Sequence, residues 1–252
     1  MRLVITGAAG VIGTILRAGL ASRYDVHGLD RKRIRGVERA DGRRLRRLEQ
    51  AFAGADAVID LAAKPNVETP WPEIWRNNLP ATMNALEAAR RAGVRRFVFA
   101  SSNHVTGMYE RDFPYSAIAA GDYGAVDRES IPLIDSHAPI RPDSPYALGK
   151  ALGEAAGRYY AEALGLPTIC LRIGTVTRDD RPKTPRQFAT LLTHADLIRL
   201  CESALEAPPE LGFGIYYGVS NNTWRFWDIA QAQAELGFFP QDDAERLRSQ
   251  QA

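Results

Sequence analysis

The chain has 252 residues, of which 45% are hydrophobic and 25% charged, and its formal net charge is +2. These values are typical of an enzyme that buries one substantial core, and they give no reason to expect a nucleic-acid partner or a membrane surface. Two cysteines are too few for a disulfide framework and lack metal-ligand spacing, and no secretory segment or long apolar span is present, so we expect a cytoplasmic protein with reduced thiols and no metal.

The first predicted strand leads directly into a glycine-rich turn. An apolar run at residues 3–5 is typical of a buried parallel strand, and the sequence TGAAGVIG follows it. Gly7 would permit a tight strand-to-helix turn, Gly10 would let the backbone approach a pyrophosphate, and Gly13 would let the next helix pack against the strand. The N-terminus of that helix would offer its N–H groups to the phosphates. A glycine-rich turn without a ligand is the alternative.

The second predicted strand, residues 26–30, ends in an acid. Asp30 follows Gly10 by about the twenty residues that separate the ribose-binding acid from the glycines of a dinucleotide fold. A carboxylate there accepts hydrogen bonds from the ribose 2′-hydroxyl and repels a 2′-phosphate, which favours NAD over NADP. The basic residues 31–33 leave the choice open, since they would either tolerate a phosphate or form a solvated turn.

The pattern then continues to alternate between strands and helices. Further strands are predicted at 57–63, 96–100, 168–174 and near 214–218, and helices up to residue 52, at 74–92, at 146–164 and at the C-terminus. The segment 108–141 reads as irregular, which in a compact domain is typical of a lid or binding element. The alternation predicts an α/β fold with a doubly wound parallel sheet of the Rossmann type. Residues 1–175 would form the dinucleotide-binding domain, and 176–252 a small substrate-binding appendage that is not an independent domain.

Ligands in such folds bind beyond the carboxyl ends of the strands. Gly7, Asp30, Ala62, Ser102 and Gly174 all fall at those predicted ends. The sequence therefore predicts one site along this edge of the sheet.

Tyr146 and Lys150 stand four residues apart and would share one face of their helix. A nearby positive charge lowers the pKa of a phenol from its ordinary value near ~10, and such a tyrosine can exchange a proton with a hydroxyl or a carbonyl. A solvated pair is the alternative. The glycine-rich turn favours the catalytic interpretation, because it would supply a hydride acceptor.

Together these features resemble the extended, sugar-modifying branch of the short-chain dehydrogenase/reductase superfamily, the NAD-dependent epimerase/dehydratase family. The matching segments are 6–13, residue 30, 61–63, 78–87, 101–102, 105–107 and 146–150. Segments 100–104, 172–175 and 186–194 further resemble uronate dehydrogenases and archaeal NAD-dependent hexose-phosphate dehydrogenases, which oxidise the anomeric carbon of a sugar to a lactone. The resemblance also implies a homo-oligomer, commonly a dimer through the two long helices.

The resemblance implies a role for each matching residue. Tyr146 would be the general base at the C1 hydroxyl, Lys150 would lower its pKa and hold the nicotinamide ribose, and Ser102 would bind the reacting oxygen. The implied NAD contacts are Gly7, Gly10, Val11, Ile12, Gly13, Asp30, Arg31, Asp41, Gly42, Leu61, Ala62, Ala63, Asn78, Tyr146, Lys150 and Ile173. The implied sugar contacts are Asn66, Ser102, Asn103, His104, Tyr146, Thr175 and Arg186.

Several of these assignments have plainer alternatives. His104 could cap a strand end, and Thr175 could be a structural hydroxyl. Arg186 suits a substrate carboxylate or phosphate, but it lies in a loop whose alignment is open. Lys64 reads as a surface residue rather than a phosphate ligand.

The sequence thus predicts an NAD-dependent dehydrogenase that acts on C1 of a hexuronic acid or a related aldose. A sugar-phosphate dehydrogenase and a nucleotide-sugar epimerase or dehydratase are the enzymatic alternatives. Epimerases usually need a larger substrate region than residues 176–252, and dehydratases tend to have acids where this chain has Asn103 and His104. A non-catalytic NAD sensor would be expected to lack Tyr146 or Lys150. The substrate's distal group stays open.

Overall fold

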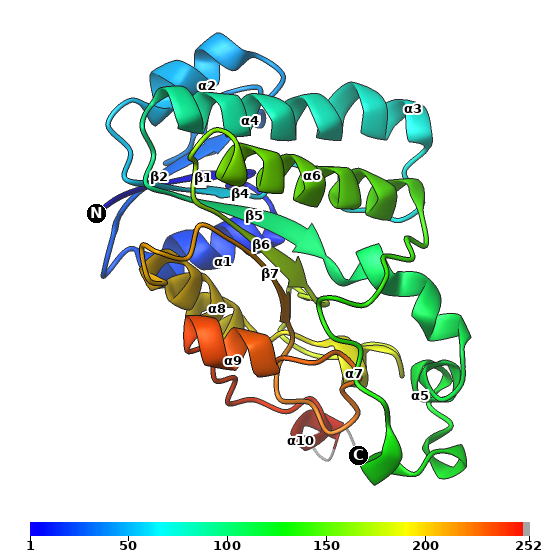
Figure 1. Cartoon of the computed structure of the whole chain (residues 1–252). Helices are drawn as coiled ribbons and strands as arrows, with labels where there is room; N and C mark the ends of the chain where they lie inside the picture. Colours follow the sequence, from blue (N-terminus) through cyan, green and yellow to red (C-terminus); the bar gives the residue numbers. More distant parts are fainter. Residues whose placement is uncertain (249–252) are drawn as a thin grey trace.

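Seven strands form one sheet in which every neighbouring pair is parallel (Figure 1). The computed structural model describes residues 1–248. The strands are β1 (Arg2–Thr6), β2 (Asp25–Asp30), β3 (Glu38–Arg39), β4 (Ala57–Asp60), β5 (Arg96–Ser102), β6 (Thr168–Ile173) and β7 (Phe213–Gly218). Their order is β3-β2-β1-β4-β5-β6-β7, so the chain reverses its direction of travel across the sheet between β1 and β4. The predicted doubly wound fold is confirmed, and this switch point is where such sheets bind ligands.

Helices cover both faces of the sheet (Figure 1). One face carries α2 (Leu45–Phe52), α4 (Leu79–Arg91) and α6 (Pro145–Glu162). The other face carries α1 (Val11–Leu20), α8 (His194–Glu206) and α9 (Ala230–Leu236). None of the helices among residues 1–248 combines the length and the apolar composition needed to cross a membrane.

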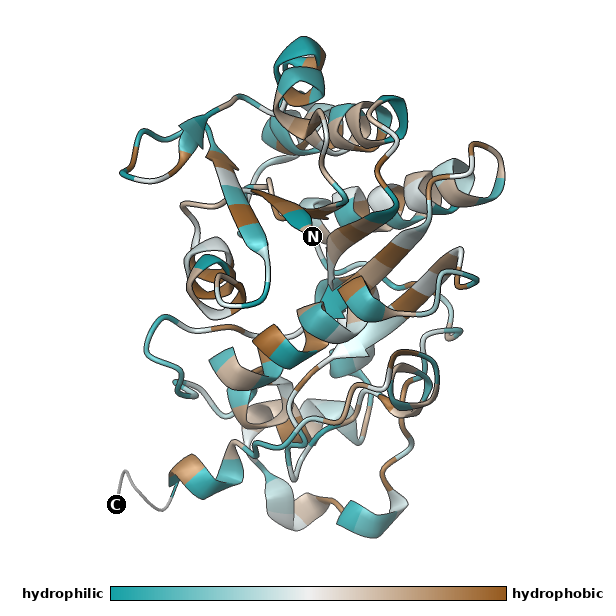
Figure 2. Cartoon of the chain, turned by 90° about the vertical axis from the view of Figure 1, so that its left-hand side faces the viewer, coloured by the Kyte–Doolittle hydropathy of each residue, from teal (hydrophilic) through white to brown (hydrophobic). Residues whose placement is uncertain are grey.

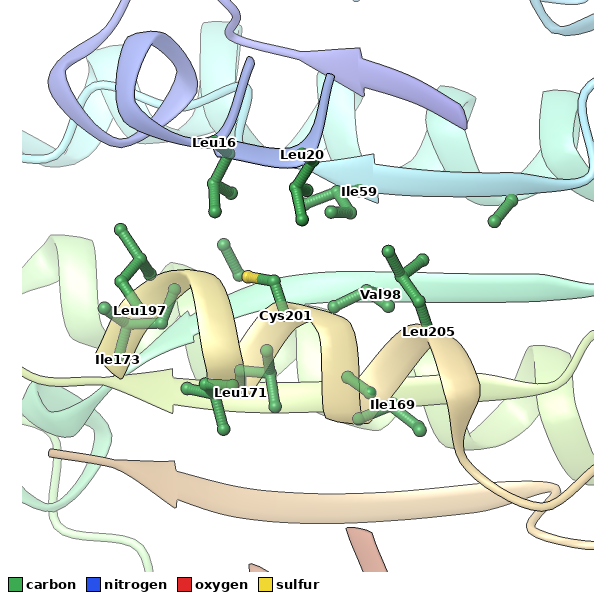
Figure 3. Close-up of a cluster of buried hydrophobic side chains, with 14 of the residues drawn as sticks. Leu16, Leu20, Ile59, Val98, Ile169, Leu171, Ile173, Leu197, Cys201 and Leu205 are labelled. Atoms are coloured by element: carbon green, nitrogen blue, oxygen red, sulfur yellow. The ribbon is translucent and has the colours of Figure 1, made fainter. Parts of the chain in front are cut away.

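Each face of the sheet has its own hydrophobic core. In the core of Figure 3, Leu16 of α1 and Cys201 of α8 pack against strand residues such as Ile59 and Leu171, and all four are at most 1% exposed. Burying a side chain of this size stabilises the fold by about 1.5–3 kcal/mol. Hydrophobic residues therefore run almost continuously along the central strands, as Figure 2 shows in brown, because both faces of a parallel sheet are covered.

Three predicted segments differ in detail from the structure. Residues 38–39 form β3, a strand that was not among those expected, because two exposed charged residues carry no strand signal. The predicted strand 57–63 ends at Asp60. The helix predicted at 74–92 begins with α3 (Trp71–Glu73) and passes through a π-helical turn, η1 (Ile74–Asn78), before α4.

The predicted irregular segment 108–141 contains several short helices. They are α5 (Tyr115–Ala120) and three 3₁₀ helices, η2 (Asn103–Arg111), η3 (Tyr123–Ala125) and η4 (Arg128–Ser130). Their brevity and their polar and proline-rich surroundings hide any helical period in the sequence. Two further short helices, α7 (Gln187–Thr190) and α10 (Glu245–Arg248), follow in the C-terminal part.

The predicted dinucleotide-binding part, residues 1–175, and the predicted appendage after it pack together in the structure. β7 and α8 follow it and yet complete the sheet and one of its cores. A third hydrophobic cluster joins the 108–141 segment, through Tyr115 and Ile118, to Phe226 and Trp227 of the C-terminal part. Figure 1 shows α5 and α7 on the side toward which the strand arrows point. The region beyond the strand ends is therefore assembled from both parts of the chain.

Candidate active site

A cleft of about 1000 Å³ runs along the carboxyl ends of the strands. Its lining includes all sixteen residues that the resemblance assigned to NAD and, of the seven assigned to the sugar, Asn66, Ser102, Asn103, His104, Tyr146 and Thr175. Arg186 does not line it. The topology thus brings together residues that are up to 168 positions apart (from Gly7 to Thr175) in one site.

The glycine-rich turn leaves room and hydrogen-bond donors for a pyrophosphate. Gly7 has a φ of +63°, and a Cβ atom there would lie 2.8 Å from the Leu61 carbonyl carbon and oxygen, so only glycine fits. Gly10 is the N-cap of α1, and neither a capping side chain nor an acidic residue occupies the first turn of that helix. The N–H groups of this turn, which begins at Val11, are therefore free to bind phosphate. The cradle fits a dinucleotide.

Asp30 is fixed at the carboxyl end of β2 by backbone hydrogen bonds. Its Oδ2 accepts from the Ala9 N–H at 3.0 Å, and its Oδ1 accepts from the Lys32 N–H at 2.8 Å. The carboxylate thereby holds the glycine-rich turn against the end of β2 and presents its negative charge to the cleft. Arg31 and Lys32 also line the cleft, but both are exposed, so water and salt screen their charges.

Replacing Asp30 with Asn should weaken NAD binding by about 10- to 100-fold, the value of a charge-assisted hydrogen bond, and should narrow the preference for NAD over NADP. Titration of cofactor fluorescence with NADH and NADPH measures both effects. Asp25→Asn, at the opposite end of β2, is the matched control and should leave both affinities unchanged. An unaltered NAD to NADP ratio in Asp30→Asn would contradict the assignment.

Asp41 lies on the same side of the cleft with a partner that the sequence did not reveal. The Arg43 Nε and Nη2 donate to Asp41 at 3.0 and 2.7 Å. This hydrogen bond outweighs partial burial and lowers the pKa of Asp41 to about 2. Arg43 also reaches Asn77 of η1, at 3.4 Å, so the pair bridges the cleft beside the predicted adenosine position. The sequence contains many arginines, and nothing near Arg43 distinguished it as the partner of Asp41.

Thr6 and Asp60 shape the wall of the cleft at the carboxyl ends of β1 and β4. They lie directly opposite each other in register on β1 and β4, and the Thr6 hydroxyl donates to the buried Asp60 carboxylate at 2.5 Å. The same hydroxyl accepts from the Leu61 and Ala62 N–H groups at 3.1 and 3.2 Å. The two residues therefore hold the chain after β4 against the cleft, a role that their buried strand positions did not indicate.

Ser102, Tyr146 and Lys150 meet in the middle of the cleft. Ser102 ends β5, while Tyr146 and Lys150 lie in the first two turns of α6. That helix begins where it does because Ser144 caps it, accepting from the Ala147 N–H at 3.1 Å, and because proline favours its first position. The Ser102 hydroxyl hydrogen-bonds the Tyr146 side chain. Each of the three residues is at most 8% exposed, so the site is largely shielded from water.

The electrostatics of Tyr146 differ from the sequence prediction. Burial raises the pKa of Tyr146 to about 12, despite the opposing hydrogen bond from Ser102, and burial lowers the pKa of Lys150 to about 8. The Lys150 Nζ donates to the Ala100 carbonyl at 2.5 Å and lies 5.9 Å from the centre of the Tyr146 ring. The expected lowering of the Tyr146 pKa by Lys150 is therefore wrong for this structure, because the ammonium bonds elsewhere and burial dominates.

Asn103 and His104 follow Ser102 in the part of the cleft that is predicted to bind the sugar. The Asn103 side chain is 2% exposed, and its Nδ2 has no hydrogen-bond partner among the described residues. The His104 Nδ1 lies 2.5 Å from the Asp143 Oδ2, and the Asp143 Oδ1 accepts from Ser144 at 2.9 Å. Asp143, which sequence reasoning missed, thereby fixes the imidazole relative to the start of α6. Both polar groups are placed to bind hydroxyls.

Arg186 lies behind the cleft wall and is already paired. Its Nε and Nη2 bind the two carboxylate oxygens of Glu110 at 2.5 and 2.6 Å, and its Nη1 lies 3.4 Å from the Thr175 hydroxyl, which does line the cleft. Arg186 therefore does not face the cleft directly, and its contact with the substrate's distal end stays a prediction. The sequence did not single out its partner, Glu110.

A buried ionic network underlies Ser102, Tyr146 and Lys150. Glu154, one turn after Lys150 on α6, accepts from the Arg172 Nε and Nη2 at 2.9 Å each and from the Ser101 hydroxyl at 2.6 Å. Arg172 also donates to the Tyr217 hydroxyl at 3.1 Å. All of these side chains are at most 5% exposed. The network joins β5, β6, β7 and α6 directly beneath the site.

The parallel sheet, the glycine-rich cradle and the Ser102–Tyr146–Lys150 cluster define a dinucleotide-dependent enzyme of the Rossmann class. The chain belongs to the NAD dependent epimerase/dehydratase family, whose model matches residues 3–195. NAD is accordingly its cofactor, as the unobstructed cradle and the Asp30 carboxylate also indicate.

Similar proteins act on sugars. A uronate dehydrogenase of Pseudomonas syringae pv. tomato is 34% identical over 98% of this chain and 84% of its own length. An NAD-dependent glucose-6-phosphate dehydrogenase of Haloferax volcanii is 32% identical over 96% of this chain and 94% of its own. The crystal structure of a uronate dehydrogenase variant from Agrobacterium tumefaciens, complexed with NAD, is 29% identical and superimposes with a TM-score of 0.81 over 99% of this chain and 88% of its own.

Proposed function

We propose that the protein is an NAD-dependent sugar dehydrogenase that oxidises C1 of a hexuronic acid or a related aldose to the lactone. NAD supplies the hydride acceptor. The proposal depends on one observation. Ser102, Tyr146 and Lys150 are buried in the same cleft as Asn103, whose Nδ2 has no hydrogen-bond partner among the described residues. The relatives' names, which are those of uronate and sugar dehydrogenases, support the same chemistry.

In this proposal Tyr146 accepts the proton of the C1 hydroxyl while the hydride leaves C1. Ser102, which hydrogen-bonds Tyr146, holds the reacting oxygen in line with the phenol. Burial keeps the Tyr146 pKa near 12, so the fraction of phenolate available to accept the proton rises as the pH is raised. Lys150 is the nearby cation in this part of the cleft, and its position on the same helix face lets it orient the ribose beside Tyr146.

The test is a screen for NADH formation with glucuronate, galacturonate, glucose, galactose and glucose 6-phosphate. Reduction of NAD with at least one of them, with a lactone as product, is the expected result. No NADH from any of these sugars would overturn the proposal and would favour an epimerase-type reaction, in which the cofactor is retained.

We further propose that the protein acts in the cytoplasm as a homodimer formed through α4 and α6. These neighbouring helices and η1 expose large hydrophobic side chains, with Trp75 at 61%, Met83 at 44%, Leu152 at 43% and Tyr159 at 58%. Leu152→Lys should shift the sedimentation coefficient from dimer to monomer, because it places a charge in the apolar contact. A wild-type monomer at micromolar concentration would contradict this interface.

A further inference from the structure

The sugar end of the cleft holds its charges in matched pairs. Arg186 is bound side-on by both oxygens of Glu110, and His104 is bound by Asp143. Burial opposes ionisation of Asp143, but the hydrogen bond and charge of His104, with a further contribution from Arg186, lower its pKa. The Glu110 carboxylate therefore already occupies the arginine that would otherwise receive an anionic group, and Asp143, paired with His104, adds a second negative charge to this part of the site.

We propose that Glu110 neutralises Arg186 so that the site selects an aldose with an uncharged distal end over a uronate or a sugar phosphate. This inference rests on the proposed function and specifies its substrate class. Within the pair, the Arg186 Nη1 still faces Thr175 on the cleft wall, so it can help to bind a hydroxyl. An anionic substrate would instead meet the Glu110 charge, and like charges brought together at such a site are strongly disfavoured.

Glu110 is held in place and is not free to make way for an anion. Its side chain is 13% exposed, and Arg186 is its only ion-pair partner in the described part of the chain. It belongs to η2, which begins at Asn103 and is continuous with the sugar end of the site. A substrate carboxylate that took Arg186 would leave the Glu110 carboxylate largely buried and unpaired, an arrangement that proteins avoid.

Arg178 also lines the cleft, but it offers only a weak site for an anion. Its side chain is exposed and lies in the loop after β6. An exposed, solvated arginine gains little from an ion pair and is screened by salt. The preference for a neutral sugar should therefore depend on Glu110 rather than on this residue.

The test measures kcat and KM of the NAD-loaded enzyme for the pairs galactose and galacturonate, glucose and glucuronate, and glucose and glucose 6-phosphate. In whichever of these three pairs is oxidised fastest, the wild-type kcat/KM should be at least about tenfold higher for the neutral sugar than for the anionic one. Glu110→Gln, which keeps the shape and removes the charge, should move this ratio toward the anionic sugar by about tenfold, mainly through KM. Because both sugars are measured on one preparation, a partly unfolded variant does not alter the ratio.

Glu129→Gln serves as the matched control, since Glu129 is an exposed residue of η4 in the same segment and is in no ion pair of the described chain. It should leave the ratio unchanged. A wild-type preference for uronates or sugar phosphates would overturn the inference while the proposed dehydrogenase function stood. An unchanged ratio in Glu110→Gln would overturn it as well. The absence of NADH from every sugar would instead refute the proposed function.

Discussion

Tyr146→Phe should lower kcat by about 10³-fold or more while leaving the affinity for NADH within about twofold of wild type. In the proposed mechanism the Tyr146 side chain takes the proton of the C1 hydroxyl, and general bases contribute about 10²- to 10⁴-fold. Stopped-flow turnover with the best sugar and fluorescence titration with NADH measure the two effects. In the wild type, the rate of oxidation should rise with pH through the neutral range, since burial holds the Tyr146 pKa above its ordinary value and raising the pH favours loss of the proton.

Tyr159→Phe provides the control for loss of a hydroxyl from the same helix. Tyr159 is 58% exposed on the outer face of α6 and lies outside the cleft, so its variant should keep normal turnover. Near-normal activity in Tyr146→Phe would show that another group takes the proton, and the mechanism proposed for Ser102 and Lys150 would fail with it.

Glu154→Gln should lower the free energy of unfolding by about 3–5 kcal/mol, because it leaves the Arg172 guanidinium buried without its counterion. Arg172 is 1% exposed and Glu154 4%, so water cannot replace the lost partner. A loss of this size is a large part of the 5–15 kcal/mol typical of a domain. Urea unfolding followed by circular dichroism measures it. The same variant should also reduce activity, since Glu154 accepts from Ser101, the neighbour of Ser102, and a displaced network would shift this end of β5.

Glu162→Gln is the matched control on the same helix. Glu162 pairs with Arg158 at 2.9 Å, but both side chains are more than half exposed, and such surface pairs contribute about 0–1 kcal/mol. Equal destabilisation by the two variants would show that burial of the Glu154–Arg172 pair does not determine its contribution to stability.

The fold could be predicted largely from the sequence because its strongest signals are local. Continuous apolar strands, a glycine-rich turn and amphipathic helices each require only a few neighbouring residues to be recognised. The exceptions were short: β3 has two exposed charged residues, and the helices of the 108–141 segment span less than the three turns that a periodic pattern needs.

The site was predictable where a residue type is demanded by geometry and not where its role depends on a distant partner. Gly7 must be glycine because its φ is positive and its Cβ position is filled by the Leu61 carbonyl. Glu110 and Arg186 are 76 residues apart, and nothing in either segment indicates that they bind each other. For the same reason, the spacing of Lys150 to Tyr146 could not show that its ammonium donates to the Ala100 carbonyl or that burial lowers its pKa.

We propose that Tyr146 and NAD together oxidise C1 of a sugar. The most direct measurement is the fate of deuterium from an aldose labelled at C1, followed by mass spectrometry of the cofactor after reaction with NAD. We expect one deuterium in the NADH formed and an unlabelled lactone as product. NADH without deuterium, or labelled sugar returned with no net reduction of NAD, would contradict it.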